Sequence, residues 1–302
     1  MTGTRASILF VVAAGILFGT AGTAQALGPS NAVPLVVGVL RIQVGAIALF
    51  LVMPRLGASR GRLVELWRRP AILVTAVAAA SYQPLFFGAV SQVGVALGTL
   101  VAVGSEPLFA GLIGWVALRH RPTAGWLAAT AVAVLGLVLR SWGRLDGGSA
   151  TGLLLALGAG VASASYTVAA KHQLDRGATT VEVPAASFVL GGLLLVPLLI
   201  GQPTAWLAQP GGAALVLYLG VATMAIANVL LTRGIHGLAP GPVATLMLTD
   251  PVVATLLGVV VLGEAISPLA GVGVVLVLAG LVLQGVVLAR ASPEDLEPAP
   301  VL

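Results

Sequence analysis

Residues Glu106-Pro-Leu-Phe-Ala-Gly-Leu-Ile-Gly-Trp-Val116 recur later in the chain as Asp250-Pro-Val-Val-Ala-Thr-Leu-Leu-Gly-Val-Val260. The two stretches align without a gap, with Pro107 on Pro251 at an offset of 251 − 107 = 144. Other matches at this offset are Ala110 with Ala254, Gly114 with Gly258 and Gly136 with Gly280. Because aliphatic identities arise easily by chance, the proline, glycine and acidic matches carry the evidence. They indicate an internal repeat that covers both halves of the chain.

The composition places the chain in a membrane. Of its 302 residues, 58% are hydrophobic and 8% are charged, whereas a soluble domain carries about 25% charged residues. Apolar runs long enough to cross a hydrocarbon core of about 30 Å follow one another along the chain. They cover residues 6–27, 33–53, 70–91, 94–118, 124–140, 150–171, 182–201, 212–232, 239–262 and 268–289. Because lipid cannot satisfy free backbone groups, the sequence predicts an all-α integral membrane protein of ten transmembrane helices.

Five helices per half is an odd number, so the two halves must enter the membrane from opposite sides. The sequence therefore predicts two five-helix inverted-topology repeats, residues 1–145 and 146–290, and a disordered cytoplasmic tail over 291–302. The first run is predicted to be a retained helix, because it has a counterpart at the start of the second half. Paired glycines, Gly15 with Gly19 and Gly94 with Gly98, are predicted to allow close helix packing.

Basic residues predict the orientation of the chain. Those expected on one side are Arg5, Arg55, Arg60, Arg62, Arg68, Arg69, Arg119, Arg121, Lys171, Arg176, Arg233 and Arg290, and those expected on the other are Arg140 and Arg144. The positive-inside rule then predicts that both termini of this multi-pass membrane protein lie in the cytoplasm. The net charge of +5 is thereby explained by topology, and no nucleic-acid partner is expected.

The segment from Pro242 to Glu264, followed by Gly271 and Gly280, resembles the end of an EamA domain, and residues 104–136 form a weaker copy. That domain typifies the drug/metabolite transporter superfamily. The resemblance covers nearly the whole chain and implies a ten-helix bacterial carrier of a family with many exporters of amino acids and other metabolites. The first half departs from the pattern, because His120 replaces the glutamate usual after the fourth helix.

Glu106 and Asp250 are the leading candidates for chemistry. Each lies near the centre of its predicted helix, and equivalent residues of inverted repeats share a depth only at the midplane. Ionisable groups at that depth are costly and usually line a functional cavity. We expect at least one of them to bind a substrate amine or a proton. The alternative is a structural carboxyl group that is protonated or paired with Arg41.

Proline follows each acid and predicts a local kink. Pro107 and Pro251 each remove a backbone hydrogen bond, which is expected to free the carbonyl groups of Val103 and Met247. Pro84, in the middle of the third predicted helix, is expected to act in the same way.

Arg41 lies within the second predicted helix, where its permanent charge requires a partner. It is expected to pair with Glu106 or Asp250, or to hold a substrate carboxylate through two hydrogen bonds. An arginine together with an acid would suit a zwitterion such as an amino acid. A structural ion pair or an arginine that extends outward to water remains the alternative.

Tyr82, Gln83 and Asn228 complete the candidate site. They lie in mid-helix, and Asn228 aligns with Pro84 because 228 − 84 = 144. Their hydroxyl and amide groups are expected to line the cavity, with hydrogen bonds between helices as the alternative.

These features predict a secondary transporter that exports small metabolites by alternating access, with amino acids as the leading class. A channel-like facilitator is the alternative. No enzyme, catalytic residue, cofactor or metal is expected, because the histidines lack metal-site spacing and the chain has no phosphate-binding loop. The expected partners are a small-molecule substrate, membrane lipid and a coupling proton, and the chain is expected to be a monomer or a weak homodimer.

Overall fold

The computed structural model describes residues 3–142 and 149–290, and every regular element in these ranges is a helix. The predicted repeat boundary after residue 145, Arg144 and the tail over 291–302 lie outside the described residues. Ten segments of the described chain are long and apolar enough to span a membrane. Their ends lie within a few residues of the predicted ends, because apolar length is a strong local signal in a membrane protein.

The first repeat contains five spans. They are formed by α1 (Thr4–Ala26), α2 (Pro34–Val52) with the 3-10 turn η1 (Met53–Leu56), two segments of α4 (Pro70–Leu118), and α5 (Ala124–Ser141). A short helix, α3 (Gly61–Trp67), lies between the second and third spans. Pro34 and Pro70 are the first residues of their helices, a position that requires no amide hydrogen.

The second repeat contains the other five spans. They are α6 (Ala150–Asp175), α7 (Glu182–Leu195) with η2 (Val196–Leu199), the run of α8 (Pro210–Tyr218), the π-helix η4 (Leu219–Ile226) and α9 (Ala227–Gly237), the pair α10 (Pro240–Leu246) and α11 (Thr249–Leu262), and α12 (Pro268–Arg290). A 3-10 turn, η3 (Ala205–Ala208), precedes α8.

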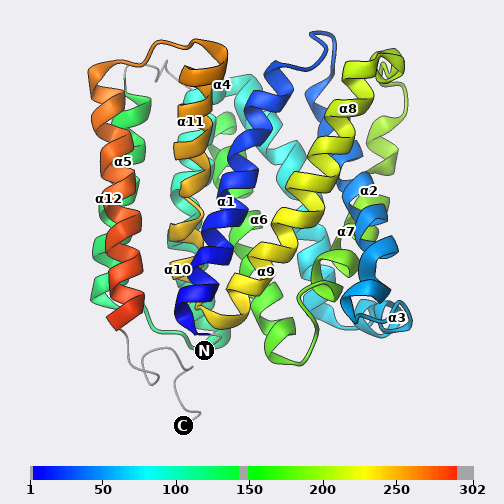
Figure 1. Ribbon diagram of the computed structural model, residues 1–302, viewed down its shortest axis with the longest axis horizontal. Helices are drawn as coiled ribbons and strands as arrows, with labels where there is room; N and C mark the ends of the chain where they lie inside the picture. Colours follow the sequence, from blue (N-terminus) through cyan, green and yellow to red (C-terminus); the bar gives the residue numbers. More distant parts are fainter. Residues whose placement is uncertain (1–2, 143–148, 291–302) are drawn as a thin grey trace.

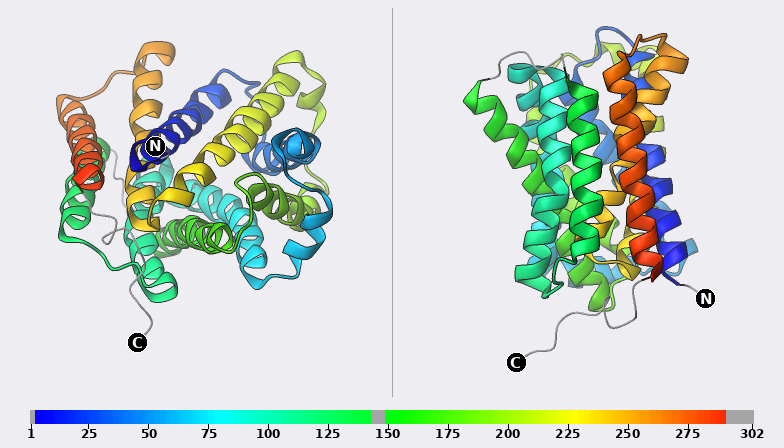
Figure 2. Two further views of the ribbon diagram at one scale, coloured as in Figure 1. Left: turned by 60° about the horizontal axis from the view of Figure 1, so that its bottom comes forward. Right: turned by 90° about the vertical axis from the view of Figure 1, so that its left-hand side faces the viewer.

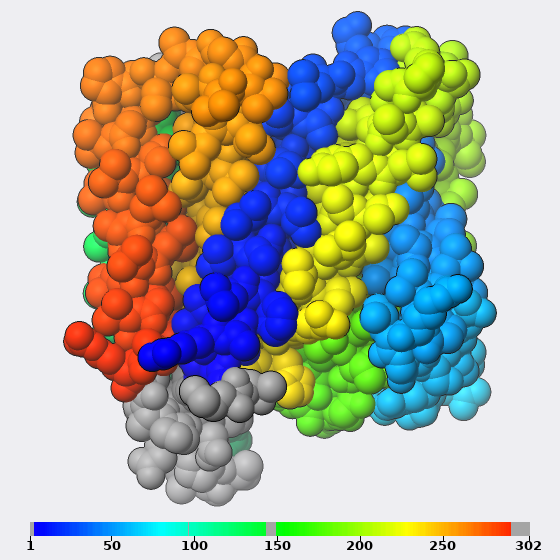
Figure 3. Space-filling view, viewed as in Figure 1, coloured from blue at the N-terminus to red at the C-terminus, as the bar shows by residue number. Residues whose placement is uncertain are grey.

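Both ends of the bundle, Thr4 and Arg290, lie on one face, which we call the terminal face and which is at the bottom of Figure 1. Helix α1 starts at this face, whereas α6 starts at the opposite face, so the repeats are inverted. Helix α5 packs on α12 and α2 packs on α7, and Figure 2 shows α5 and α12 side by side. Helix α1 runs between α9 and α11, as Figure 3 shows, and α6 packs on α4 in the equivalent way.

The symmetry extends to single backbone hydrogen bonds. Arg119 and Gly263, which are equivalent because 263 − 119 = 144, both end a span in the left-handed conformation, with φ of 59° and 68°. The amide of the next residue returns to the helix in each case: His120 N–H donates to Gly114 O at 3.3 Å and Glu264 N–H to Gly258 O at 3.0 Å. The two repeats therefore share a helix-ending motif although their side chains differ there.

Gly94 has a conformational role instead of the predicted packing role. Its φ of 76° and ψ of 164° interrupt α4 between the spans 70–95 and 97–118. A methyl group added to Gly98 would lie 3.4 Å from the Val90 Cα atom, so the two spans fold back on each other as a hairpin. Gly19, in contrast, packs as predicted, because an added methyl group would lie 2.7 Å from the carbonyl oxygen of Asp250.

Candidate functional site

Charged side chains from both repeats meet inside the bundle. Arg41 of α2 interacts electrostatically with Tyr82 of α4 and with Asp250 of α11. Glu106, on the second span of α4, interacts in the same way with Tyr82 and Asp250. All four side chains are largely removed from bulk water, yet each keeps some accessible surface. The structure therefore brings four of the predicted site residues together.

Arg140 of α5 also belongs to this group, although the sequence did not single it out as a site residue. Its Nε atom donates a hydrogen bond to Thr255 Oγ1 of α11, and its charge interacts with Asp250. Most basic residues are expected on one side of the membrane, and Arg140 is one of the few expected on the other. This position was the signal that could have identified it. We call Arg41, Tyr82, Glu106, Arg140 and Asp250 the central cluster.

Asp250 lies directly after a break in its span. Helix α10 ends at Leu246 and α11 begins at Thr249, and the two residues between them form a turn. The prediction that Pro251 leaves the Met247 carbonyl free is wrong, because that carbonyl accepts the Asp250 N–H at 3.0 Å. The chain tightens into this turn and so replaces the hydrogen bond that proline cannot donate.

Glu106 has a different environment. The backbone stays helical through Pro107 and Pro84, since the non-helical residue within α4 is Gly94. The Ser163 hydroxyl of α6 lies close to the Glu106 carboxyl group. The equivalent position in α1 is Gly19, because 163 − 19 = 144, and glycine offers no hydroxyl group to Asp250. The two acids are thus equivalent in the repeat and unequal in their surroundings.

Arg41 has a buried Nε atom without a hydrogen-bond partner among the described residues. No direct ion pair joins Arg41 to Glu106 or Asp250 in the described chain, so the predicted pairing is limited to an electrostatic interaction with Asp250. A buried guanidinium N–H group without a partner is destabilising, and such exceptions in native proteins are few. This group is therefore available to a ligand.

Gln83 and Asn228 are both buried, and their described contacts are with helices of the bundle. Gln83 packs against Gly38 of α2, where an added methyl group would lie 3.1 Å from Gln83 Oε1. Asn228 donates from Nδ2 to the carbonyl groups of Met224 at 2.9 Å and Thr223 at 3.4 Å within its own span. It thereby satisfies carbonyl groups at the end of the π-helix η4, an element often found at functional sites.

Comparison with known proteins gives a family. The model of the EamA-like transporter family matches residues 5–142 and again residues 150–285. The uncharacterized transporter YwfM of Bacillus subtilis is 37% identical over 279 residues, which cover 91% of this chain and 92% of that protein. A probable terminal-alkyne amino-acid exporter of Streptantibioticus cattleyicolor is 31% identical over 249 residues, 80% of this chain and 81% of that protein.

A solved crystal structure shares the fold. It superimposes with a TM-score of 0.81 at 22% identity and covers 94% of this chain and 99% of its own. The two matches of the family model, the ten spans and the inverted repeats agree with one another. The chain therefore belongs to the EamA-like transporter family and is a multi-pass membrane protein built from two EamA repeats.

Proposed function

We propose that this transporter exports small zwitterionic metabolites, with amino acids as the leading class, by alternating access across the bacterial inner membrane. The observation that carries the proposal is the central cluster, in which charged side chains from both repeats interact and the buried Nε atom of Arg41 has no partner among the described residues. A zwitterion offers both a carboxylate and an amine to such a cluster. The exporter from Streptantibioticus cattleyicolor, whose name specifies an amino acid, supports the same class.

The roles of the side chains follow from their charge. Arg41 binds the substrate carboxylate, because a guanidinium presents several N–H donors in one plane. Glu106 and Asp250 bind the substrate amine or a coupling proton, and Tyr82, which interacts with both, provides a hydroxyl group. Arg140 holds Asp250 in place by its charge and by its hydrogen bond to Thr255.

The terminal face is proposed to be cytoplasmic. It bears most of the basic residues outside the hydrocarbon core, including Arg62, Arg69 and Arg176, and such residues are concentrated on the cytoplasmic side of membrane proteins. Because the central cluster forms within one chain, a monomer in lipid is sufficient for transport, and a weak homodimer would carry two independent pathways.

The test is counterflow into proteoliposomes preloaded with a mixture of amino acids. The native protein is expected to exchange labelled amino acid, and Glu106→Gln, Asp250→Asn and Arg41→Gln are expected to lose this activity. Glu65→Gln is the matched control, because Glu65 is an exposed carboxylate on α3 away from the cluster. An ion current without saturable exchange would instead establish a channel, and full activity in all three variants would exclude the central cluster as the substrate site.

A further inference from the structure

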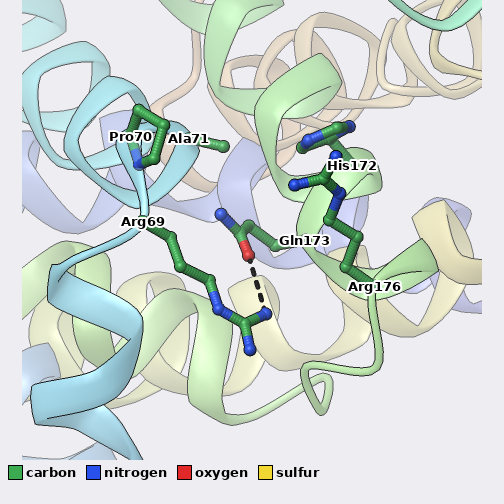
Figure 4. Close-up of a pocket in the computed structure, with 6 residues that line it drawn as sticks. All are labelled: Arg69, Pro70, Ala71, His172, Gln173 and Arg176. Carbon is green, nitrogen blue, oxygen red and sulfur yellow. Dashed lines mark hydrogen bonds between the residues drawn. The ribbon is translucent and has the colours of Figure 1, made fainter.

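A cavity lies at the terminal face, and none of the residues that line it belongs to the central cluster. Its volume is about 340 Å³, and the lining residues, which we call the basic pocket, are Arg69, Pro70, Ala71, His172, Gln173 and Arg176. In Figure 4, His172 and Arg176 lie beside one another on α6, across the cavity from Pro70 and Ala71 at the start of α4. The first repeat thus forms one wall of the pocket and the second repeat forms the other.

The pocket gathers basic side chains without a lining carboxylate. His172 and Arg176 are one helical turn apart on α6, and His172 lies near both Arg176 and Asp175. The Arg176 side chain is exposed and makes no hydrogen bond or ion pair with the described residues. The Arg176 guanidinium is therefore free to bind an anion at the pocket.

The nearby carboxylates neutralise the positive charge of the pocket only in part. Asp175 is paired with Lys171 at 2.9 Å. Glu65 pairs with Arg69 Nη2 at 3.0 Å, but its side chain is 63% exposed, so water weakens this pair. The other terminal nitrogen of Arg69, Nη1, donates to Gln173 Oε1 at 3.4 Å, which directs the guanidinium toward the pocket wall formed by α6.

The start of α4 adds a further positive contribution. Pro70 is the first residue of this helix, and Ala71 in its first turn also lines the pocket. The partial positive charge at the N-terminus of a helix favours a bound anion, and it acts here together with two guanidinium groups.

We propose that the basic pocket binds a phosphate group and thereby joins the two repeats at the terminal face. Arginine forks match phosphate oxygens, and basic pockets between transmembrane helices on the cytoplasmic side are suited to acidic lipid headgroups. Its volume is in the range of roughly 300–1,000 Å³ that small-molecule sites have. The phosphate belongs either to an anionic lipid headgroup or to a free phosphate ester. A bound phosphate stabilises the arrangement in which the start of α4 and the end of α6 lie together.

The experiment measures thermal unfolding of the full chain in nanodiscs. One arm adds inorganic phosphate to discs of phosphatidylcholine, with sodium chloride at equal ionic strength as the reference. The other arm replaces part of the phosphatidylcholine by phosphatidylglycerol without added phosphate. Stabilisation in the first arm identifies a free phosphate ester, and stabilisation confined to the second identifies a lipid headgroup. A bound ligand is expected to raise the melting temperature by on the order of a few degrees.

Arg176→Gln and Arg69→Gln are expected to lose the stabilisation. Arg176→Gln is the safer variant for folding, because that side chain is exposed and has no partner in the described chain. Arg55→Gln is the matched control, since Arg55 is an exposed arginine at the same face outside the pocket. The proposal is overturned if neither arm stabilises the native protein, if the pocket variants keep the effect, or if Arg55→Gln loses as much. Transport is not the readout, so the result is independent of the proposed substrate.

Discussion

Gly136 of α5 and Gly280 of α12 each lie against the backbone of the other helix, at positions related by the repeat offset. A methyl group added to Gly136 would lie 2.6 Å from the Gly273 carbonyl oxygen, and one added to Gly280 would lie 2.9 Å from the Ala129 carbonyl oxygen. The two contacted residues are equivalent as well, because 273 − 129 = 144. The α5–α12 interface is therefore self-complementary, as expected for a contact on a pseudo-two-fold axis.

Enlarging either glycine should destabilise the protein. Gly136→Leu and Gly280→Leu force the two helices apart and are expected to lower the free energy of unfolding by about 1–3 kcal/mol each. Thermal unfolding in detergent measures this loss. Gly285→Leu is the control on the same helix, because open space surrounds Gly285. Equal melting temperatures for the three variants would contradict the close packing at this interface.

The substitution Gly94→Ala tests the hairpin of α4. A φ of 76° with a ψ of 164° is a backbone conformation that is nearly restricted to glycine, so alanine is expected to cost about 1–3 kcal/mol of stability. The control is Gly271→Ala, because Gly271 lies in α12 with open space around it and helical geometry that alanine prefers. Thermal unfolding at one pH compares the two. A Gly94→Ala variant as stable as Gly271→Ala would show that the span reversal tolerates a side chain.

The stability of the protein should fall in mild acid because of His120. Burial lowers the pKa of the His120 imidazole below its ordinary value, and the charge of Lys171 lowers it further while Asp175 opposes them. The unfolded chain then binds more protons than the folded one near pH 6.5 and below, so acid favours unfolding. The melting temperature is expected to fall between pH 7.5 and 5.5, and His120→Gln should reduce this fall. An identical pH dependence in the variant would exclude His120 as the cause.

Arg140 should matter for transport although it was not evident as a site residue from the sequence. Arg140→Gln removes the positive charge near Asp250 and is expected to raise the KM for counterflow by about 10-fold or more. Thr255→Val removes the hydroxyl that accepts from Arg140 Nε and donates to the Pro251 carbonyl, but it keeps the Arg140 charge, so its effect should be smaller. A Thr255→Val variant as impaired as Arg140→Gln would assign the effect to the hydrogen bond instead of the charge.

Features encoded by neighbouring residues were predictable, and features that depend on distant contacts were not. The spans and the inverted repeat follow from apolar length and a constant offset, both of which are readable along the chain. The site role of Arg140 was not predicted, because its partners Thr255 and Asp250 lie on another helix. Asn228 differs from Arg140, because its amide group donates hydrogen bonds to carbonyl groups of its own span and not to another helix.

The unequal backbones of the two fourth spans have a consequence for the proposed alternating access. If the two repeats exchange conformations, α4 must form a turn at Val103 and Gly104, which are equivalent to Met247 and Leu248. Residues 240–262 must then form one continuous helix. Pro107 would then follow a break, as Pro251 does here. The opposite-facing state would therefore be assembled from backbone conformations that this structure already contains, with each repeat adopting the conformation that the other repeat has here.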